Sequence, residues 1–368
     1  MQPIALCYGT RPQVIKASVL RRELSRHWPV VAVDTGQHYD FALNQLLYEQ
    51  LEVAPPDHFL EAGSASHAVQ TATILTRMEG LLARIAPAAV VVIGDTNSTL
   101  GCALAASKAG LPVNHVEAGL RAQDAHMPEE INRRLVDAIG TLLCAPGRSS
   151  TDRLKRERAD ARVVNTGDVA LDVLRISEPR LPPVAGLLPN GFGPTYAFAT
   201  LHRAELTCDP ARLVTVLETL GGIGLPVLLA LHPRTRAVLA AAGEKREQLG
   251  QLTIIEPVGY LESLALTRSA TLVVTDSGGI QREAYWLGVP CLTLRQETEW
   301  KETVELGANR LVEPRSVKEE LPRAVKHQME RWPDGARWDR GEYGEGAAAS
   351  KIVAATGEWL AAADQRVR

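Results

Sequence analysis

The chain has 368 residues, 45% of them hydrophobic and 23% charged, and a formal net charge of −3. This length exceeds what one hydrophobic core usually holds, so we expect two domains. The small charge without a basic run argues against a nucleic-acid partner, and no apolar stretch is long enough to span a membrane. The five cysteines are scattered without metal-ligand spacing, and the first residues lack a signal-peptide pattern. We therefore expect a cytoplasmic protein that binds no metal.

The first half of the chain alternates short apolar runs with helical patterns. Apolar runs predict strands at 4–8, 30–34, 89–93, 112–116 and 141–145. Helices are expected after the first and third runs, ending near Arg21 and at Gly110 respectively. Such alternation is typical of a parallel sheet with helices on both faces.

The segment 176–193 is rich in proline and glycine and lacks periodicity, which predicts a linker. After it the alternation restarts, with strands expected at 196–200, 226–230, 252–255, 272–274 and 291–294. The fold class is therefore α/β, with two Rossmann-like domains, 1–175 and 194–345, that face each other across a cleft. A final helix, 347–364, is expected to return to the first domain. In such sheets ligands bind beyond the carboxyl ends of the strands, where the polar clusters of this chain fall.

The first polar cluster, residues 9–13 with a lysine on the next helix, brings two cations near a helix start. Arg11 and Lys16 are five residues apart and are predicted to face a phosphate. The alternative is a solvated basic pair. No GxGxxG follows the first strand, so we expect no nicotinamide or other dinucleotide cofactor.

Three acids follow strand ends in the first half. Asp95 comes directly after one apolar run, Glu117 follows the next, and Glu129 opens a helical pattern. Crowded carboxylates separate their pKa values, which lets one site hold both an acid and a base. The structural alternatives are helix capping by Asp95 and a helix-dipole role for Glu129. The expected charge partners of Glu117 are Arg121 and Arg133.

Two histidines follow strand ends in the second half. His202 and His232 each precede an arginine by at most two residues, and neither has metal-ligand spacing. A lone histidine is usually structural. The repetition of the same pattern after two strands predicts contact with a ligand.

A turn of small residues, Ser277, Gly278 and Gly279, follows an expected strand and begins a helix. Because these residues have almost no side chain, backbone N–H groups at the helix start can touch an anion, which the helix dipole also favours. Glu283, one turn further, is placed to accept hydrogen bonds from ribose hydroxyls. We therefore expect a nucleoside-diphosphate site, and the alternative is a plain glycine-rich turn.

The motifs GTRPQVIK, TGQH, GDTNST, HVEAGLR, PEEINR, LHRAE, HPRTR and TDSGGIQREA occur in this order along nearly the whole chain. In this set and order the chain resembles the non-hydrolysing UDP-N-acetylglucosamine 2-epimerases. The resemblance implies the GT-B architecture and a UDP-sugar substrate. It also implies interconversion of UDP-GlcNAc and UDP-ManNAc through loss and re-addition of UDP, with a 2-acetamidoglucal intermediate. Members of the family need neither metal nor nicotinamide, and they are commonly homodimers.

The resemblance assigns roles by motif match. Catalytic roles fall on Asp95, Glu117, Glu129 and His202. UDP-binding roles fall on Arg11, Lys16, Ser277, Gly278, Gly279 and Glu283. His232 matches a position associated with a second, activating UDP-GlcNAc in bacterial members.

The chain departs from the commonest bacterial pattern at three positions. Gln13 and Arg282 stand where many members have glutamate, and Trp300 stands where many have arginine. With GTRPQ, HRAE and TEWKET, the chain resembles a branch that includes archaeal enzymes and epimerases of UDP-2,3-diacetamido-2,3-dideoxyglucuronic acid. That sugar nucleotide is therefore an alternative substrate. A hydrolysing 2-epimerase and a GT-B glycosyltransferase are further alternatives.

Overall fold

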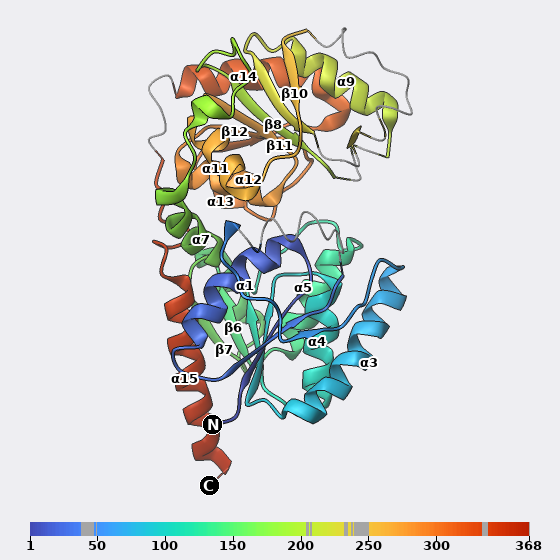
Figure 1. Ribbon diagram of the computed structural model, residues 1–368, viewed down its shortest axis with the longest axis vertical. Coiled ribbons are helices and arrows are strands. Elements are labelled where there is room, and N and C mark those ends of the chain that lie inside the picture. The colour runs from blue at the N-terminus through green and yellow to red at the C-terminus, as the bar shows by residue number, and fades with distance from the viewer. Residues whose placement is uncertain are drawn as a thin grey trace. The chain divides into compact units, whose positions relative to one another are not determined.

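The computed structural model describes residues 1–37, 48, 50–203, 206, 208–231, 235–236, 238, 250–332 and 338–367. The chain forms two compact units (Figure 1). Unit 1 comprises Met1–Pro179 and Gly341–Arg368, and unit 2 comprises Arg180–Arg340.

Unit 1 is built on a seven-stranded sheet in the order β3-β2-β1-β4-β5-β6-β7, in which every printed pairing is parallel. Its strands are β1 (Ile4–Tyr8), β2 (Val30–Asp34), β3 (His58–Phe59), β4 (Ala89–Ile93), β5 (Val113–Val116), β6 (Leu142–Ala145) and β7 (Arg162–Asn165). Its helices are α1 (Arg11–Leu24), α3 (His67–Ile85), α4 (Asn97–Lys108), α5 (Pro128–Ile139), α6 (Arg148–Glu157), α7 (Val169–Ser177) and α15 (Ala348–Val367). Helices α1, α7 and α15 pack together, as do α3, α4 and α5.

Small residues set the distance between α3 and α4. A Cβ atom added to Gly101 of α4 would lie 2.7 Å from the side chain of Ile74 on α3, so only glycine permits this approach. The same helices bury Met78 and Cys102 against β1 and β4, whose residues are all buried. The central strands are therefore covered on both sides, which explains why they read as continuous apolar runs.

Unit 2 contains a six-stranded sheet in the order β10-β9-β8-β11-β12-β13, again with parallel pairings. Its strands are β8 (Ala197–Leu201), β9 (Val227–Leu231), β10 (Leu252–Ile255), β11 (Leu272–Thr275), β12 (Cys291–Thr293) and β13 (Asn309–Leu311). Its helices include α9 (Pro210–Gly221), α11 (Tyr260–Ser269), α12 (Gly278–Leu287), α13 (Lys301–Glu305) and α14 (Val317–Arg331). The predicted α/β class with parallel sheets is confirmed, and both sheets share the strand order of a Rossmann fold.

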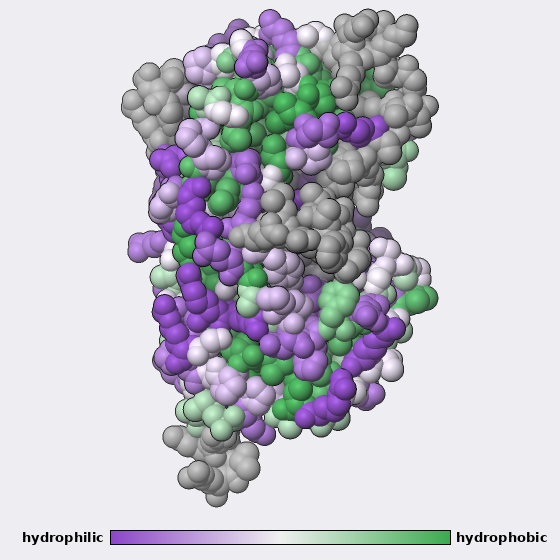
Figure 2. Space-filling view, in the orientation of Figure 1, coloured by the Kyte–Doolittle hydropathy of each residue, from purple (hydrophilic) through white to green (hydrophobic). Residues whose placement is uncertain are grey.

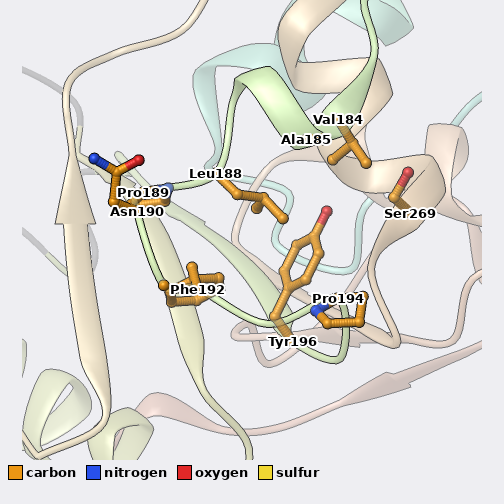
Figure 3. A pocket seen from close by; sticks show the side chains of 10 residues that line it. Val184, Ala185, Leu188, Pro189, Asn190, Phe192, Pro194, Tyr196 and Ser269 are labelled. Atoms are coloured by element: carbon orange, nitrogen blue, oxygen red, sulfur yellow. The ribbon is translucent and has the colours of Figure 1, made fainter.

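The later part of the predicted linker packs against unit 2. Within the expected linker, Val184, Leu188 and Phe192 pack against the core of unit 2 around Tyr196. Together with neighbouring residues they line an apolar cavity of about 420 Å³, shown in Figure 3. Since Tyr196 directly precedes β8, this cavity lies at the amino end of that strand, away from the carboxyl ends where ligands bind.

The C-terminal helix α15 belongs to unit 1, although it follows unit 2 in the sequence. It packs against α1 and α7, and the carboxylate of Asp172 on α7 accepts hydrogen bonds from the backbone N–H groups of Ala348 (2.9 Å) and Ala349 (2.7 Å). Asp172 thus supplies acceptors for the otherwise unsatisfied first N–H groups of α15.

The face drawn in Figure 2 intersperses hydrophilic and hydrophobic residues over both units. Within the described ranges, no helix combines the length and apolarity needed to cross a bilayer.

Candidate active site

The strand order places one reversal point in each sheet. Chain order reverses between β1 and β4 in unit 1, and between β8 and β11 in unit 2. Doubly wound sheets bind ligands beyond the carboxyl ends of the strands at such points. Most predicted site residues lie directly after these four strands or β5, which makes the carboxyl edge of each sheet a candidate binding site.

Gln13 links the two turns at the reversal point of unit 1. Its Oε1 accepts hydrogen bonds from the backbone N–H groups of Gly9 (2.9 Å) and Thr10 (3.2 Å). Its Nε2 donates to the carbonyl of Ile93 (2.6 Å) and the hydroxyl of Thr99 (2.9 Å). This role requires a side chain that both accepts and donates, which an ionised glutamate cannot do.

Glu117 forms an ion pair with Lys16, and both side chains are nearly buried. Of the two arginines expected beside it, Arg121 contacts the carboxylate of Asp137 and Arg133 contacts that of Asp95. Glu117 has a backbone φ of 70°, a left-handed conformation that costs a non-glycine residue about 1–3 kcal/mol. The surrounding fold therefore holds this carboxylate in a strained position beside a cation.

Asp95 forms a two-pronged contact with Arg133 on α5. Its Oδ2 accepts hydrogen bonds from Nε (2.9 Å) and Nη2 (2.5 Å) of that arginine. Asp95 does not cap α4, because Thr96 is the N-cap residue and its Oγ1 accepts from the N–H of Thr99. The Asp95 side chain remains 29% exposed, so the carboxylate is fixed but accessible.

The two glutamates at the start of α5 differ in their surroundings. Glu129 is exposed, whereas Glu130 is fully buried. The carboxylate of Glu130 accepts hydrogen bonds from the N–H of Ala122 (2.8 Å) and from Arg133 (3.3 Å) and Arg134 (2.8 Å). Glu130 therefore holds the loop after β5 against α5, while Glu129 stays open to solvent.

His115 and Asp137 support the turns that carry Asp95 and Glu117. Nδ1 of His115 lies 2.8 Å from Asp137 Oδ1, and Nε2 lies 2.8 Å from the carbonyl of Gly94. Oδ2 of Asp137 accepts from Arg121 (2.6 Å) and the N–H of Gly119 (3.1 Å). Burial alone raises the pKa of Asp137, but the hydrogen bond and charge of His115, with Arg121, outweigh burial and lower it.

The sequence reasoning did not include Glu130, His115 or Asp137 among the site residues. His115 and Glu130 lie inside the motifs HVEAGLR and PEEINR, so the motifs themselves were the available signal. Asp137 had no local signal, because its partners lie on β5 and in the loop after it, whereas Asp137 lies on α5.

In unit 2, the buried Asp276 orients His202. Oδ2 of Asp276 accepts from the backbone N–H groups of His202 (2.9 Å) and Arg203 (2.8 Å). Nδ1 of His202 lies 3.0 Å from Asp276 Oδ1, and the imidazole remains 40% exposed. Burial alone raises the pKa of Asp276, but the hydrogen bond and charge of His202 and the two N–H groups lower it. An acid directly after a strand was the signal for Asp276, as for Asp95.

The turn after β11 begins α12 as predicted. Ser277 is the N-cap residue, and its Oγ accepts from the N–H of Ile280 (3.4 Å). Gly278 and Gly279 form the first positions of the helix, and Glu283 lies one turn further, half-buried. This geometry leaves room for an anion to approach the helix start.

Arg11 and His232 are the remaining residues that were predicted to bind a ligand. Arg11 begins α1 beside the unit 1 turn and is half-buried. His232 lies outside the described residues. Among the residues with described positions, no three His, Cys, Asp or Glu side chains are grouped to hold a metal ion.

Comparison with known proteins identifies relatives along nearly the whole chain. The family model described as UDP-N-acetylglucosamine 2-epimerase matches residues 22–357. A UDP-2,3-diacetamido-2,3-dideoxy-D-glucuronate 2-epimerase from Pseudomonas aeruginosa is 44% identical over 313 residues, covering 83% of this chain and 86% of the relative. A UDP-N-acetylglucosamine 2-epimerase from Methanocaldococcus jannaschii is 38% identical, covering 95% and 97%.

Solved structures agree with these relatives. The M. jannaschii UDP-GlcNAc 2-epimerase in complex with UDP-GlcNAc and UDP has a TM-score of 0.86 at 38% identity, covering 97% of this chain and 99% of that one. MurG from Acinetobacter baumannii has a TM-score of 0.54 at 14% identity, with 97% and 100% covered, and shows likeness of fold alone. These likenesses confirm the predicted GT-B class of fold.

Proposed function

The chain belongs to the family of UDP-N-acetylglucosamine 2-epimerases, and on this premise we propose that it interconverts UDP-GlcNAc and UDP-ManNAc. The reaction inverts C2 of the sugar. Since the hydrogen on C2 is very weakly acidic, its removal is coupled to departure of UDP from C1. Stabilising the charge that develops on the diphosphate is then as important as the base.

We propose that the reaction proceeds by elimination of UDP followed by its re-addition. A carboxylate takes the proton from C2, the C–H electrons form a C1–C2 double bond, and the C1–O bond to UDP breaks with its electrons on the diphosphate. A second acid returns a proton to C2 from the opposite face. In this addition to the 2-acetamidoglucal intermediate, the electrons of the C1–C2 double bond form the new C2–H bond, and a diphosphate oxygen of UDP bonds to C1.

The observation that carries this proposal is the ion pair of Glu117 with Lys16 at the carboxyl edge of unit 1. A neighbouring ammonium group favours the ionised form of a carboxylate, as a base requires. We assign proton transfer to Glu117 together with Asp95 and Glu129. Because the Asp276 carboxylate orients His202, we assign that histidine to proton transfer or to the departing diphosphate.

The remaining assignments concern binding. We propose that UDP is held at the start of α12 by Ser277, Gly278 and Gly279, with Glu283 on the ribose. Helix starts offer N–H donors and a favourable dipole to phosphate groups. We further assign Arg11 and Lys16 to the nucleotide diphosphate, and His232 to a second UDP-GlcNAc.

The decisive experiment is turnover in D₂O. Incubation with UDP-GlcNAc should yield UDP-ManNAc, with deuterium at C2 of the sugar, as measured by proton NMR. A GT-B glycosyltransferase would need an acceptor and would leave C2 unlabelled. A hydrolysing 2-epimerase would release free ManNAc and UDP in equal amounts.

A second substrate is favoured by one specific observation. The relative from P. aeruginosa, at 44% identity, is named for UDP-2,3-diacetamido-2,3-dideoxy-D-glucuronate. The same C2 chemistry on that sugar nucleotide is the alternative proposal. Comparing kcat/KM for both UDP-sugars separates the two, and lack of turnover of UDP-GlcNAc would rule out the first.

We also propose that the protein is a cytoplasmic homodimer that supplies sugar nucleotides for cell-surface polysaccharides. Its five cysteines are free thiols, which suits a reducing compartment. Ile131 and Leu135 on α5 and Val69 on α3 are large apolar side chains on the surface, in two helices of one layer, as a subunit interface requires. Light scattering coupled to gel filtration would test the dimer, which a monomeric mass at micromolar concentration would contradict.

A further inference from the structure

The start of α12 carries an arginine whose side chain folds back toward the glycine turn. Nε of Arg282 donates to the carbonyl of Gly278 (3.2 Å), and the residue is only 6% exposed. Side chains on a helix point back toward its N-terminus, so this contact brings the guanidinium beside the first turn. The site that we propose for the diphosphate therefore has a buried cation next to it.

An indole ring fixes the position of this guanidinium. Cζ of Arg282 lies 4.0 Å from the ring centroid of Trp300 and 5.9 Å from that of Trp286. A Cβ atom added to Gly278 would lie 3.7 Å from Nε1 of Trp300, so the same ring also borders the turn. Stacking of a guanidinium on an indole stabilises the cation by cation–π attraction.

Two positive charges lie close together at this turn. The start of a helix carries a partial positive charge, and the guanidinium of Arg282 adds a full charge beside it. A doubly charged diphosphate at the turn would be attracted by both, because opposite charges attract strongly where water is excluded.

A second, independent group points to the same place. Gln281 is fully buried, and its Oε1 accepts hydrogen bonds from Thr298 (2.8 Å) and Asn309 (3.0 Å). Its Nε2 has no hydrogen-bond partner in the part of the chain that the structure describes. This Nε2 would lie 3.8 Å from a Cβ atom on Gly278, so an uncommitted donor borders the turn. A buried donor without a partner is costly, which favours a ligand acceptor there.

Buried contacts also hold the loop that presents Trp300. The backbone N–H of Trp300 donates to Oγ1 of Thr298 (3.2 Å), the same hydroxyl that binds Gln281. Two hydrogen bonds of 3.0 and 3.2 Å join Arg295 to Glu299 in the same loop, and both residues are nearly buried. The indole of Trp300 is therefore held in place before any ligand binds, which lowers the entropic cost of binding.

We propose that Arg282 binds the diphosphate of the substrate at the start of α12, with Trp300 as its positioning residue and Gln281 as an additional donor. This inference rests on the proposed UDP-sugar function. It assigns to Arg282 the charge that stabilises UDP as it leaves and returns. In this chain the cation is therefore Arg282 of α12, and the aromatic ring that positions it is Trp300.

The test measures UDP binding by calorimetry and uridine binding by competition. Arg282→Gln should weaken UDP binding by about 10- to 100-fold, as expected for the loss of a charge-assisted phosphate contact. Uridine, which has no phosphate, should lose less than about threefold. Arg282→Lys, which keeps the charge, should retain affinity between those of the wild type and Arg282→Gln.

The matched control is Arg268→Gln on α11, which removes the same charge from an exposed site in the same unit. It should leave UDP affinity unchanged. Equal UDP affinity of Arg282→Gln and the wild type would overturn the inference, as would an equal loss for UDP and uridine, which indicates general disruption. These binding results are independent of turnover. If the wild type binds UDP but incorporates no deuterium at C2 of the sugar, the proposed function is refuted, and the result for Arg282 can still be interpreted.

Discussion

Lys16 and Glu117 are 101 positions apart in the chain, and they form an ion pair at the carboxyl edge of unit 1. Lys16 comes from α1, and Glu117 follows β5, two strands away from β1 in the sheet. Their side chains are 8% and 9% exposed, so the ion pair compensates charges that are largely removed from water.

Replacement of Glu117 should separate catalysis from binding. Glu117→Gln should lower kcat by about 100- to 10,000-fold, as expected for loss of a general base. The affinity for UDP should change much less than kcat, because the turn and the glutamate that we propose to hold the nucleotide, residues 277–279 and Glu283, lie in unit 2. Assays with NMR detection would measure kcat, and calorimetry would measure the affinity for UDP. An unchanged kcat would show that Glu117 takes no part in the mechanism.

The same change should also lower stability. Leaving Lys16 buried without its partner costs about 3–5 kcal/mol in comparable pairs. The double variant Lys16→Met with Glu117→Gln should recover much of this loss in urea unfolding, since it removes the uncompensated charge. With Lys16→Met as the second single variant, a loss in the double variant equal to the sum of the two single losses would show that the pair is not coupled.

Asp276→Asn should impair His202 without removing it. The amide oxygen of asparagine can still accept the two backbone N–H groups, but its NH₂ group cannot accept a hydrogen bond from Nδ1 of the imidazole. We expect kcat to fall by about 10- to 100-fold, near the lower limit for proton-transfer residues. The effect should nearly vanish in a His202→Gln background, which a double-mutant cycle of kcat values would measure. Additive losses would contradict this relationship.

Asp137 should make stability depend on acid pH. Because its pKa in the folded protein lies below its ordinary value of 3.8, its contribution is fully present above about pH 4. That contribution is lost as pH falls through the lowered pKa, when the unfolded state binds the proton more readily. The difference in Tm between the wild type and Asp137→Asn should therefore shrink below about pH 4. A constant difference from pH 3 to pH 7 would contradict this assignment.

Gln13→Glu should destabilise unit 1 in a pH-dependent way. An ionised carboxylate cannot donate to the Ile93 carbonyl and would face it at close range. We expect a loss of about 1–3 kcal/mol at neutral pH, the cost of a buried unsatisfied group. Below the raised pKa of such a glutamate, the protonated acid can donate, so stability should recover as pH falls. Gln251→Glu, an exposed change of the same kind, is the control and should show no such recovery.

The amino-acid sequence by itself determined the α/β class, the central strands and the positions of the polar turns. Strands buried on both faces must be apolar along their whole length, so β1, β4 and β11 stand out as continuous runs. The polar residues that follow such a run mark the carboxyl end of a strand, which is how Asp95 and Ser277 were found. Strands β3, β7 and β13 escaped prediction, because they are two to four residues long and mostly partly exposed.

Only the tertiary structure decided which charges meet. The sequence did not indicate that Lys16 pairs with Glu117 or that Arg133 pairs with Asp95, and the structure shows both ion pairs. Likewise Asp276 and His202 lie 74 positions apart in the chain, and the backbone N–H of His202 donates to the carboxylate of Asp276. Local periodicity specifies each strand and turn, but the order of strands in the sheet sets which turns are neighbours. Ion pairs across that edge depend on this order, and no local pattern encodes it.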